Sequence, residues 1–169
     1  PVPDPKEFND YILVFPAGSG IKPIYVYLKE DPRKLPGVVT GRGVLLSPGT
    51  RWLDMSVSNN GNGAPIPAHI ADKLRGREFK TFDEFREALW LEVSQDPELI
   101  AQFSSGNQTR IKQGLTAKAP IDGWYYGPKE IVKKFQIHHR VAVEYGGSVY
   151  DIDNLRIVTP RLHDEIHYR

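Results

Sequence analysis

Cysteine is absent from this chain of 169 residues. No disulfide framework therefore holds the fold, and folding does not depend on a redox compartment. The sequence also lacks any apolar run close to the roughly 18 residues of a membrane-spanning helix, so we expect a soluble chain without a membrane-spanning segment. Its length predicts one domain of ordinary size with a modest extension.

An excess of charge is missing as well, because 22 basic residues are balanced by 21 acidic ones. The overall charge therefore gives little support for nucleic-acid binding, and the local distribution matters more. Four basic residues cluster around one pair of histidines near the C-terminal end: Lys129, Lys133, Lys134 and Arg140. We expect the positive potential of the molecule to be concentrated there.

Histidine is scarce, with five in the chain, yet four of them fall within residues 138–169. Residues 155–158 form a short β-prone run, and Thr159 and Pro160 then fit the N-cap and first position of a helix. On that helix His163 and His167 are four residues apart, so their rings project from one face. The two histidines are therefore placed to bind the same ion.

The remaining pair, His138 and His139, follows a segment, 134–137, that alternates like a strand. Adjacent strand residues point to opposite faces, so one of the two can reach an ion held by the helical pair while its neighbour cannot. A strand, a turn-rich loop, a second strand and a helix would place three imidazoles on one ion and a fourth beside it. Three protein ligands with an open position are typical of catalytic zinc-like sites, whereas structural sites fill all four positions.

The spacing of these residues resembles a known nuclease motif. His138-His139, fourteen residues, Asn154, eight residues, His163, three residues and His167 are similar to the His-Asn-His (HNH, ββα-metal) motif of the E-group colicins and S-type pyocins. The similarity continues upstream, in residues 65–75, 78–86 and 90–99, and covers about residues 31–169. It implies an α+β fold: a mostly helical HNH nuclease domain with a short β-rich N-terminal extension.

The resemblance assigns roles to individual residues. It implies that one divalent ion, Zn²⁺, Ni²⁺ or Mg²⁺, is held by three ligands: His138, His163 and His167. His139 would be the general base, because a neutral imidazole can accept a proton from water at physiological pH. Asn154 would hold the loop that orients His139, and Arg33 would contact the scissile phosphate. Where the colicins carry a glutamate, this chain has Gln136, which can hydrogen-bond Arg33 but cannot form an ion pair with it.

The implied activity is metal-dependent, largely non-specific hydrolysis of phosphodiester bonds in DNA. The residues taken alone do not exclude an RNA substrate. Further contacts to the DNA backbone are expected from three basic residues: Arg86, Lys133 and Lys134. The competing interpretation is a non-catalytic, metal-stabilised module that binds DNA or protein. His139 separates the two, because a purely structural ion has no use for an additional imidazole that does not bind it.

A partner protein is expected at a glycine-flanked loop in residues 120–127. Three adjacent aromatic residues there, Trp124, Tyr125 and Tyr126, are hard to bury together, and exposed aromatic side chains often dominate protein interfaces. In the resembled family this region binds a small acidic immunity protein, which silences the toxin in its producer.

The middle of the domain is predicted to be helical and to form the core. Residues 67–75 and 81–93 have helical spacing, with a capping box at Thr81 to Glu84, and a further helix begins at Asp96-Pro97. The apolar stripe of the second helix is interpreted as core: Phe82, Phe85, Leu89, Trp90 and Val93. Residues 104–130 are polar and then aromatic.

The first 30 residues differ in residue pattern from the rest of the chain. Two apolar, β-prone runs, 11–15 and 22–28, are separated by a glycine-containing turn, which predicts a hairpin. Residues 15–25 resemble the end of the S-type pyocin domain that precedes the killing domain. We therefore expect residues 1–30 to be the end of a translocation domain with its linker, and residues 31–169 to be the cytotoxic domain.

The same resemblance implies that the chain is the C-terminal part of a bacteriocin. Such a toxin would be released from its producer and act in the cytoplasm of the target bacterium. Its receptor contacts would lie in an N-terminal portion outside this sequence.

Overall fold

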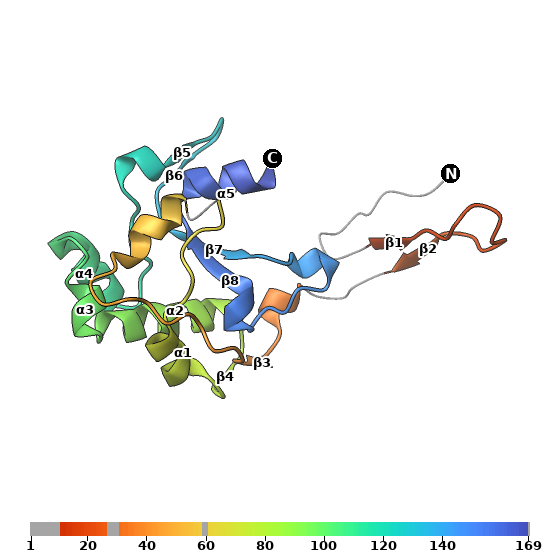
Figure 1. The fold of residues 1–169 in the computed structure, drawn as a ribbon. Coiled ribbons are helices and arrows are strands. Elements are labelled where there is room, and N and C mark those ends of the chain that lie inside the picture. Colours follow the sequence, from red (N-terminus) through yellow and green to blue (C-terminus); the bar gives the residue numbers. More distant parts are fainter. Residues whose placement is uncertain (1–10, 27–30, 59–60, 169) are drawn as a thin grey trace.

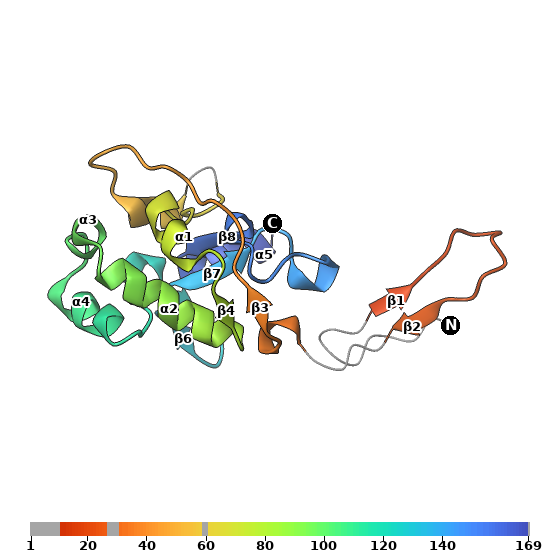
Figure 2. The ribbon, with the colours of Figure 1, turned by 90° about the horizontal axis from the view of Figure 1, so that it is seen from below.

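The computed structural model describes residues 11–26, 31–58 and 61–168. Strands β1 (Tyr11–Leu13) and β2 (Ile24–Val26) pair antiparallel, so the predicted N-terminal hairpin is confirmed over these residues. In both views of the ribbon this hairpin lies apart from the other elements (Figures 1 and 2). The parts of the expected extension at 1–10 and 27–30 lie outside the described residues.

The following segment contains short elements and then four helices. The short elements are η1 (Pro32–Lys34), β3 (Gly37–Val38), η2 (Trp52–Val57) and β4 (Glu78–Phe79). The helices are α1 (Ala68–Leu74), α2 (Phe82–Ser94), α3 (Pro97–Ile100) and α4 (Ser105–Lys112). Strand β3 pairs antiparallel with β4.

Side-chain caps explain where three of these helices begin. Thr81 accepts a hydrogen bond from the backbone N–H of Glu84, as predicted, and Asp96 accepts one from Leu99. Ser104 caps α4 in the same way. The sequence pattern does not predict helix α4, because Ile111 is its only buried side chain and the helix has no apolar periodicity.

The C-terminal part folds into a strand pair and a helix, as the motif predicts. Strand β7 (Gln136–His139) pairs antiparallel with β8 (Leu155–Val158), and helix α5 (Pro160–His167) follows. Before them, β5 (Tyr125–Tyr126) pairs with β6 (Ile131–Val132) after a turn, η3 (Ile121–Gly123). The loop between β7 and β8 contains η4 (Val143–Tyr145) and η5 (Ile152–Asn154). These elements agree with the predicted α+β class.

The β7–β8 pair lies between two sets of helices. Helix α2 lies on one side of it and α5 on the other (Figures 1 and 2). The interior on the α2 side contains the predicted stripe, in which Phe85, Leu89 and Val93 are fully buried. Ile157 of β8 is also fully buried, and its backbone exchanges hydrogen bonds with Ala64 at 2.7 and 2.8 Å. The core therefore fixes one face of the strand pair and leaves the other to α5.

Within the described residues, none of the helices has both the length and the apolar character needed to cross a membrane.

Candidate metal centre and catalytic site

The register of β7 and β8 sends the adjacent histidines to different environments. His138 is opposite Arg156 and His139 is opposite Leu155. Since alternate strand residues share a face, His139 lies with Ile137 on the face toward the core, and His138 lies on the face that α5 covers. The predicted divergence of the pair is therefore present in the structure.

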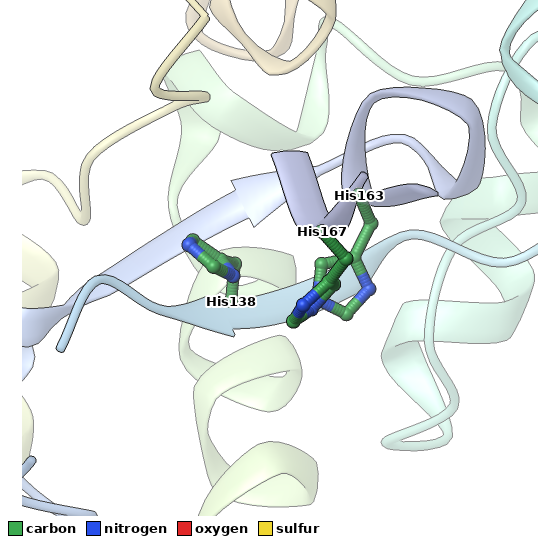
Figure 3. A group of neighbouring side chains, drawn as sticks. All are labelled: His138, His163 and His167. Atoms are coloured by element: carbon green, nitrogen blue, oxygen red, sulfur yellow. The ribbon is translucent and has the colours of Figure 1, made fainter. Parts of the chain in front are cut away.

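Helix α5 places two more histidines against His138. Thr159 caps the helix through a 3.2 Å hydrogen bond from the N–H of Leu162, and Pro160 occupies the first turn, as predicted. The ring centroid of His138 is 5.3 Å from that of His163 and 5.6 Å from that of His167. Figure 3 shows the three side chains converging from β7 and α5.

The donor atoms of this cluster fit a metal ion. One ring nitrogen from each of His138, His163 and His167 lies within 4.8 Å of the other two. The Nε2 atoms of His163 and His167 are 2.9 Å apart, so both face the same point. Among the residues that the structure describes, three imidazole nitrogens converge in this group, and such a set suits a borderline cation such as Zn²⁺ in a site that keeps an open position.

Gln136 contacts one ring of the histidine cluster and restricts its orientation. Its side-chain Oε1 contacts Nδ1 of His163, and because a carboxamide oxygen only accepts, Nδ1 of His163 donates. The lone pair of His163 is then on Nε2, which faces His167. A partner on the second ring nitrogen is a usual feature of metal-binding histidines. Gln136 thus contacts a predicted metal ligand, a contact that the comparison with the colicin glutamate did not suggest.

Burial keeps His163 in its neutral form. Desolvation, followed by the neighbouring histidines His167, His138 and His139, lowers the pKa of His163 to about 4. The ring is therefore unprotonated at physiological pH, which is the form that binds a cation.

His139 is separated from the three converging rings and is largely buried, with 7% of its surface exposed. Its ring lies 5.0 Å from that of Phe82, and its Nε2 is 3.1 Å from the backbone oxygen of Val149. Burial lowers the pKa of His139, and the nearby charge of Arg33 acts in the same direction. Because a carbonyl oxygen only accepts, Nε2 donates to Val149. The lone pair is then on Nδ1, and the neutral ring is able to accept a proton.

Asn154 joins the two ends of the loop between β7 and β8. Its Oδ1 accepts from the N–H of Val141 at 2.8 Å, and its Nδ2 donates to the carbonyls of Val141 and Ser148 at 3.1 and 3.0 Å. The backbone oxygen of Asn154 also accepts from Arg140 at 2.8 Å. Because His139 directly precedes this loop, these contacts restrict the backbone that carries it.

Arg33 comes from the other end of the domain. It belongs to η1, where the carboxylate of Asp31 accepts from its backbone N–H at 3.0 Å and lies 3.3 Å from its Nη1. The charge of Arg33 is one of the causes that lower the pKa of His139, so the guanidinium is close enough to act on that ring.

The three predicted DNA-contacting residues lie together beside the cluster. Arg86, Lys133 and Lys134 line one open groove of about 650 Å³, which Gln136 and His163 also line. Lys118 lines the groove as well, and nothing in the sequence pointed to it. Its position follows from a backbone bridge to Lys134, which depends on the folded chain rather than on a local pattern.

The three predicted partner-binding aromatics do not form one exposed surface. Trp124 packs partly against the core, and its Nε1 donates to the carbonyl of Ala119 at 2.8 Å. Tyr125 lines a pocket with His163 and His167. Tyr126 is 61% exposed, because alternate residues of β5 face opposite ways.

Comparison with known proteins identifies the class. Residues 37–169 match the family model described as "Colicin/Pyocin-S2, DNase domain", and residues 1–27 match the S-type pyocin model. The chain therefore belongs to the colicin and pyocin DNase-domain family, which confirms the resemblance, the nuclease class and the fold expected from the sequence.

Individual relatives are similar over most of this chain. Pyocin-S1 of Pseudomonas aeruginosa is 47% identical over 162 residues, which are 94% of this chain and 24% of that protein. Colicin-E8 of Escherichia coli is 47% identical over 132 residues, 78% of this chain and 60% of the colicin. The chain thus spans about a quarter of the length of Pyocin-S1.

Solved structures show the same fold. The DNase in the crystal structure of the pyocin AP41 DNase–immunity complex has a TM-score of 0.70 and 45% sequence identity to this chain. The match covers 79% of this chain and 98% of that one. The mutant nuclease domain of pyocin S8, solved with its cognate immunity protein, has a TM-score of 0.70 and 41% identity.

Proposed function

We propose that this domain is the killing part of a bacteriocin and hydrolyses phosphodiester bonds in DNA with the help of one divalent ion. The observation that carries the proposal is the divergence of His138 and His139. One joins His163 and His167 in a cluster that could hold a metal ion, and the other lies across the strand pair with a lowered pKa. The toxin would be released from its producer and act in the cytoplasm of the target bacterium.

Each proposed site residue has a separate role in the hydrolysis of the phosphodiester bond. Neutral His139 takes a proton from a water molecule whose oxygen attacks the phosphorus, and the bond from phosphorus to the 3′ oxygen breaks. Asn154 holds the backbone that carries His139, and the guanidinium of Arg33 binds phosphate oxygens with its planar fork. A divalent ion bound by the three histidines would stabilise negative charge on the phosphate and on the departing oxygen.

The ligand set bears on the choice of metal. Imidazole nitrogens suit Zn²⁺ and Ni²⁺, whereas Mg²⁺ prefers oxygen ligands and usually keeps several waters. Because the three converging ligands are all histidines, they favour a transition ion over Mg²⁺.

Cleavage of supercoiled plasmid tests the proposal. We expect nicking after the metal-free protein is supplied with Zn²⁺, Ni²⁺ or Mg²⁺ in separate reactions, and its loss when excess chelator is added. Circular dichroism of each sample controls for folding. A folded protein that binds metal but nicks DNA with none of these ions would favour the alternative, a metal-stabilised binding module. A matched RNA substrate in the same assay separates DNase from RNase activity.

The groove beside the metal centre is proposed to bind the DNA backbone. Its basic lining residues are Arg86, Lys118, Lys133 and Lys134, and Glu130 lines it as well. Arg86 is paired with Asp83 at 2.6 Å and lies over the ring of Phe82. The Nζ of Lys133 lies 4.9 Å from the ring centroid of Trp124. These contacts hold two of the cations at the edge of the groove.

Removing two of these charges should reduce the salt dependence of binding. For Lys133→Ala combined with Lys134→Ala, we expect the slope of log K against log salt to become less negative by about 0.9 per lost phosphate contact. Binding is measured with chelator present, so that DNA stays intact, and on several sequences, because backbone contacts carry little sequence information. Lys73→Ala, which removes a cation of α1 that faces Glu92 of α2, is the control. An unchanged slope in the double variant would exclude the groove as the binding surface.

A small acidic immunity protein is the proposed inhibitor. Support comes from the two similar DNases, both of which were solved in complex with immunity proteins. We propose that Tyr126, the most exposed of the three aromatics, contributes directly to that interface, and that Trp124 and Tyr125 shape it from beneath. We further propose that residues 1–30 end a translocation domain, that residues 31–169 form the cytotoxic domain, and that receptor contacts lie outside this sequence.

A further inference from the structure

Residues 31–44, which we call the N-terminal strap, run along the loop that precedes β8. The backbone N–H of Thr40 donates to the carbonyl of Tyr150 at 3.1 Å, and the N–H of Ile152 donates to the carbonyl of Thr40 at 2.8 Å. In Figure 1 the strand of this strap, β3, lies beside the loop that joins β7 to β8. The strap carries Arg33, so these contacts determine where the arginine segment runs.

The side chain of Asp153 fixes the far end of the strap. Its two carboxylate oxygens accept from the backbone N–H groups of Arg42 and Gly43, at 3.0 and 2.9 Å. Hydrogen bonds to a charged acceptor are stronger than those between neutral groups. This end of the strap is therefore anchored about ten residues away from Arg33. That distance along the chain is too long for the anchor alone to set the position of Arg33.

Tyr150 fixes the strap close to Arg33. Its hydroxyl donates to the carbonyl of Leu35 at 2.8 Å, two residues beyond the arginine. The ring lies directly against the backbone of Gly37, where an added Cβ would be only 2.2 Å from the ring atom Cδ2. The ring is itself held by Phe82 and Phe85, whose centroids are 6.1 and 6.2 Å away.

The same stretch of loop also contacts the proposed general base. The carbonyl of Val149, the residue before Tyr150, is 3.1 Å from Nε2 of His139. Phe82 contacts both rings, with its centroid 5.0 Å from that of His139 and 6.1 Å from that of Tyr150. Two consecutive loop residues thus contact His139 and the N-terminal strap that carries Arg33. These contacts fix the position of the two groups relative to each other.

We propose that Tyr150 is a positioning residue, which sets the place of Arg33 relative to His139 through its hydrogen bond to Leu35. The inference rests on the proposed function, in which Arg33 binds the scissile phosphate. A phosphate held by the arginine then lies within reach of the water that His139 deprotonates. Small displacements of such a group are costly, since catalysis depends on the alignment of the reacting atoms.

Tyr150→Phe isolates the hydroxyl, because the ring and its contacts with Phe82 and Phe85 remain. We expect the rate of cleavage at saturating DNA to fall about five- to tenfold, the scale of one lost hydrogen bond and a loosened arginine. Metal affinity, measured by titration calorimetry without DNA, is expected to stay unchanged. Tyr145→Phe is the matched control, since Tyr145 belongs to the same loop and is 87% exposed.

A double-mutant cycle with Arg33→Ala makes the test specific. If Tyr150 acts through Arg33, removing its hydroxyl slows the wild-type enzyme but has no further effect once the arginine is gone. Gly37→Ala, which forces a methyl group against the Tyr150 ring, is expected to show the same dependence on Arg33. A general loss of structure would instead slow cleavage by the same factor in the protein with Arg33 and in the Arg33→Ala variant.

The outcomes separate this inference from the function on which it rests. An equal slowing by Tyr150→Phe with and without Arg33, or no slowing in a protein that needs Arg33, would overturn the positioning role and leave the arginine's role intact. If Arg33→Ala cleaves as fast as wild type, the arginine step fails and the positioning role fails with it. Absence of any metal-dependent cleavage by the wild type would refute the proposed function itself.

Discussion

His139→Ala is expected to reduce DNA cleavage by about 10²- to 10⁴-fold, the usual contribution of a general base, while metal affinity stays close to that of the wild type. The reason is geometric. His139 lies on the core face of β7, beside Phe82 and Val149, whereas the three rings of the cluster converge on the opposite face. Plasmid cleavage and calorimetric titration of Zn²⁺ on the same samples provide the two readouts.

His138→Ala is the matched comparison, because it removes the adjacent imidazole from the same strand. It is expected to weaken metal binding, which His139→Ala does not. If His139→Ala instead loses the metal and His138→Ala keeps it, the roles of the two neighbours have been exchanged. Thermal unfolding of both variants is needed, since His139 is largely buried and its removal leaves a cavity next to Phe82.

His163→Ala is expected to have the second large effect, a loss of metal affinity on the order of 100-fold or more together with the loss of cleavage. Replacing a residue that merely orients a ligand already costs about 10- to 100-fold in affinity or activity, and His163 is itself a proposed ligand. It is also the ring that contacts Gln136 and faces Nε2 of His167. Titration calorimetry with Zn²⁺ measures the change directly.

Two further variants serve as comparisons for His163→Ala. Gln136→Ala is expected to give a smaller loss of metal affinity than His163→Ala, because it frees the ring orientation without removing a donor. His69→Ala, which removes a histidine paired with Asp96 at 2.7 Å outside the cluster, is expected to leave metal binding unchanged. Metal affinity that survives His163→Ala would exclude the proposed centre.

Local signals in the sequence predicted the ββα unit well. The cap and proline at Thr159-Pro160 determine where α5 begins, and the four-residue spacing on that helix then places His163 and His167 together. Strand alternation separated His138 from His139 in the same way. Each of these inferences needs only residues that are close in sequence or belong to one motif.

The remaining features depend on contacts between distant parts of the chain. Helix α4 has a capping residue but buries only Ile111, so its polar sequence lacks apolar periodicity. The packing of Trp124 follows from a hydrogen bond to the carbonyl of Ala119, which no pattern in the sequence predicts. The resemblance pointed to Arg33, but the contact that holds its segment comes from Tyr150, which is far from it in sequence and carries no local signal of that contact.

The order of the chain has a consequence for the cell that synthesises it. Arg33 is translated early, and His138 and His139 are translated late. Helix α5, which supplies His163 and His167, is translated after every other part of the proposed site. In a growing chain on the ribosome, the three converging histidines therefore come together only after helix α5 has emerged and folded. A fragment that stops before α5 would lack two of the three converging histidines, and under the proposed function it could neither hold the ion nor cleave DNA.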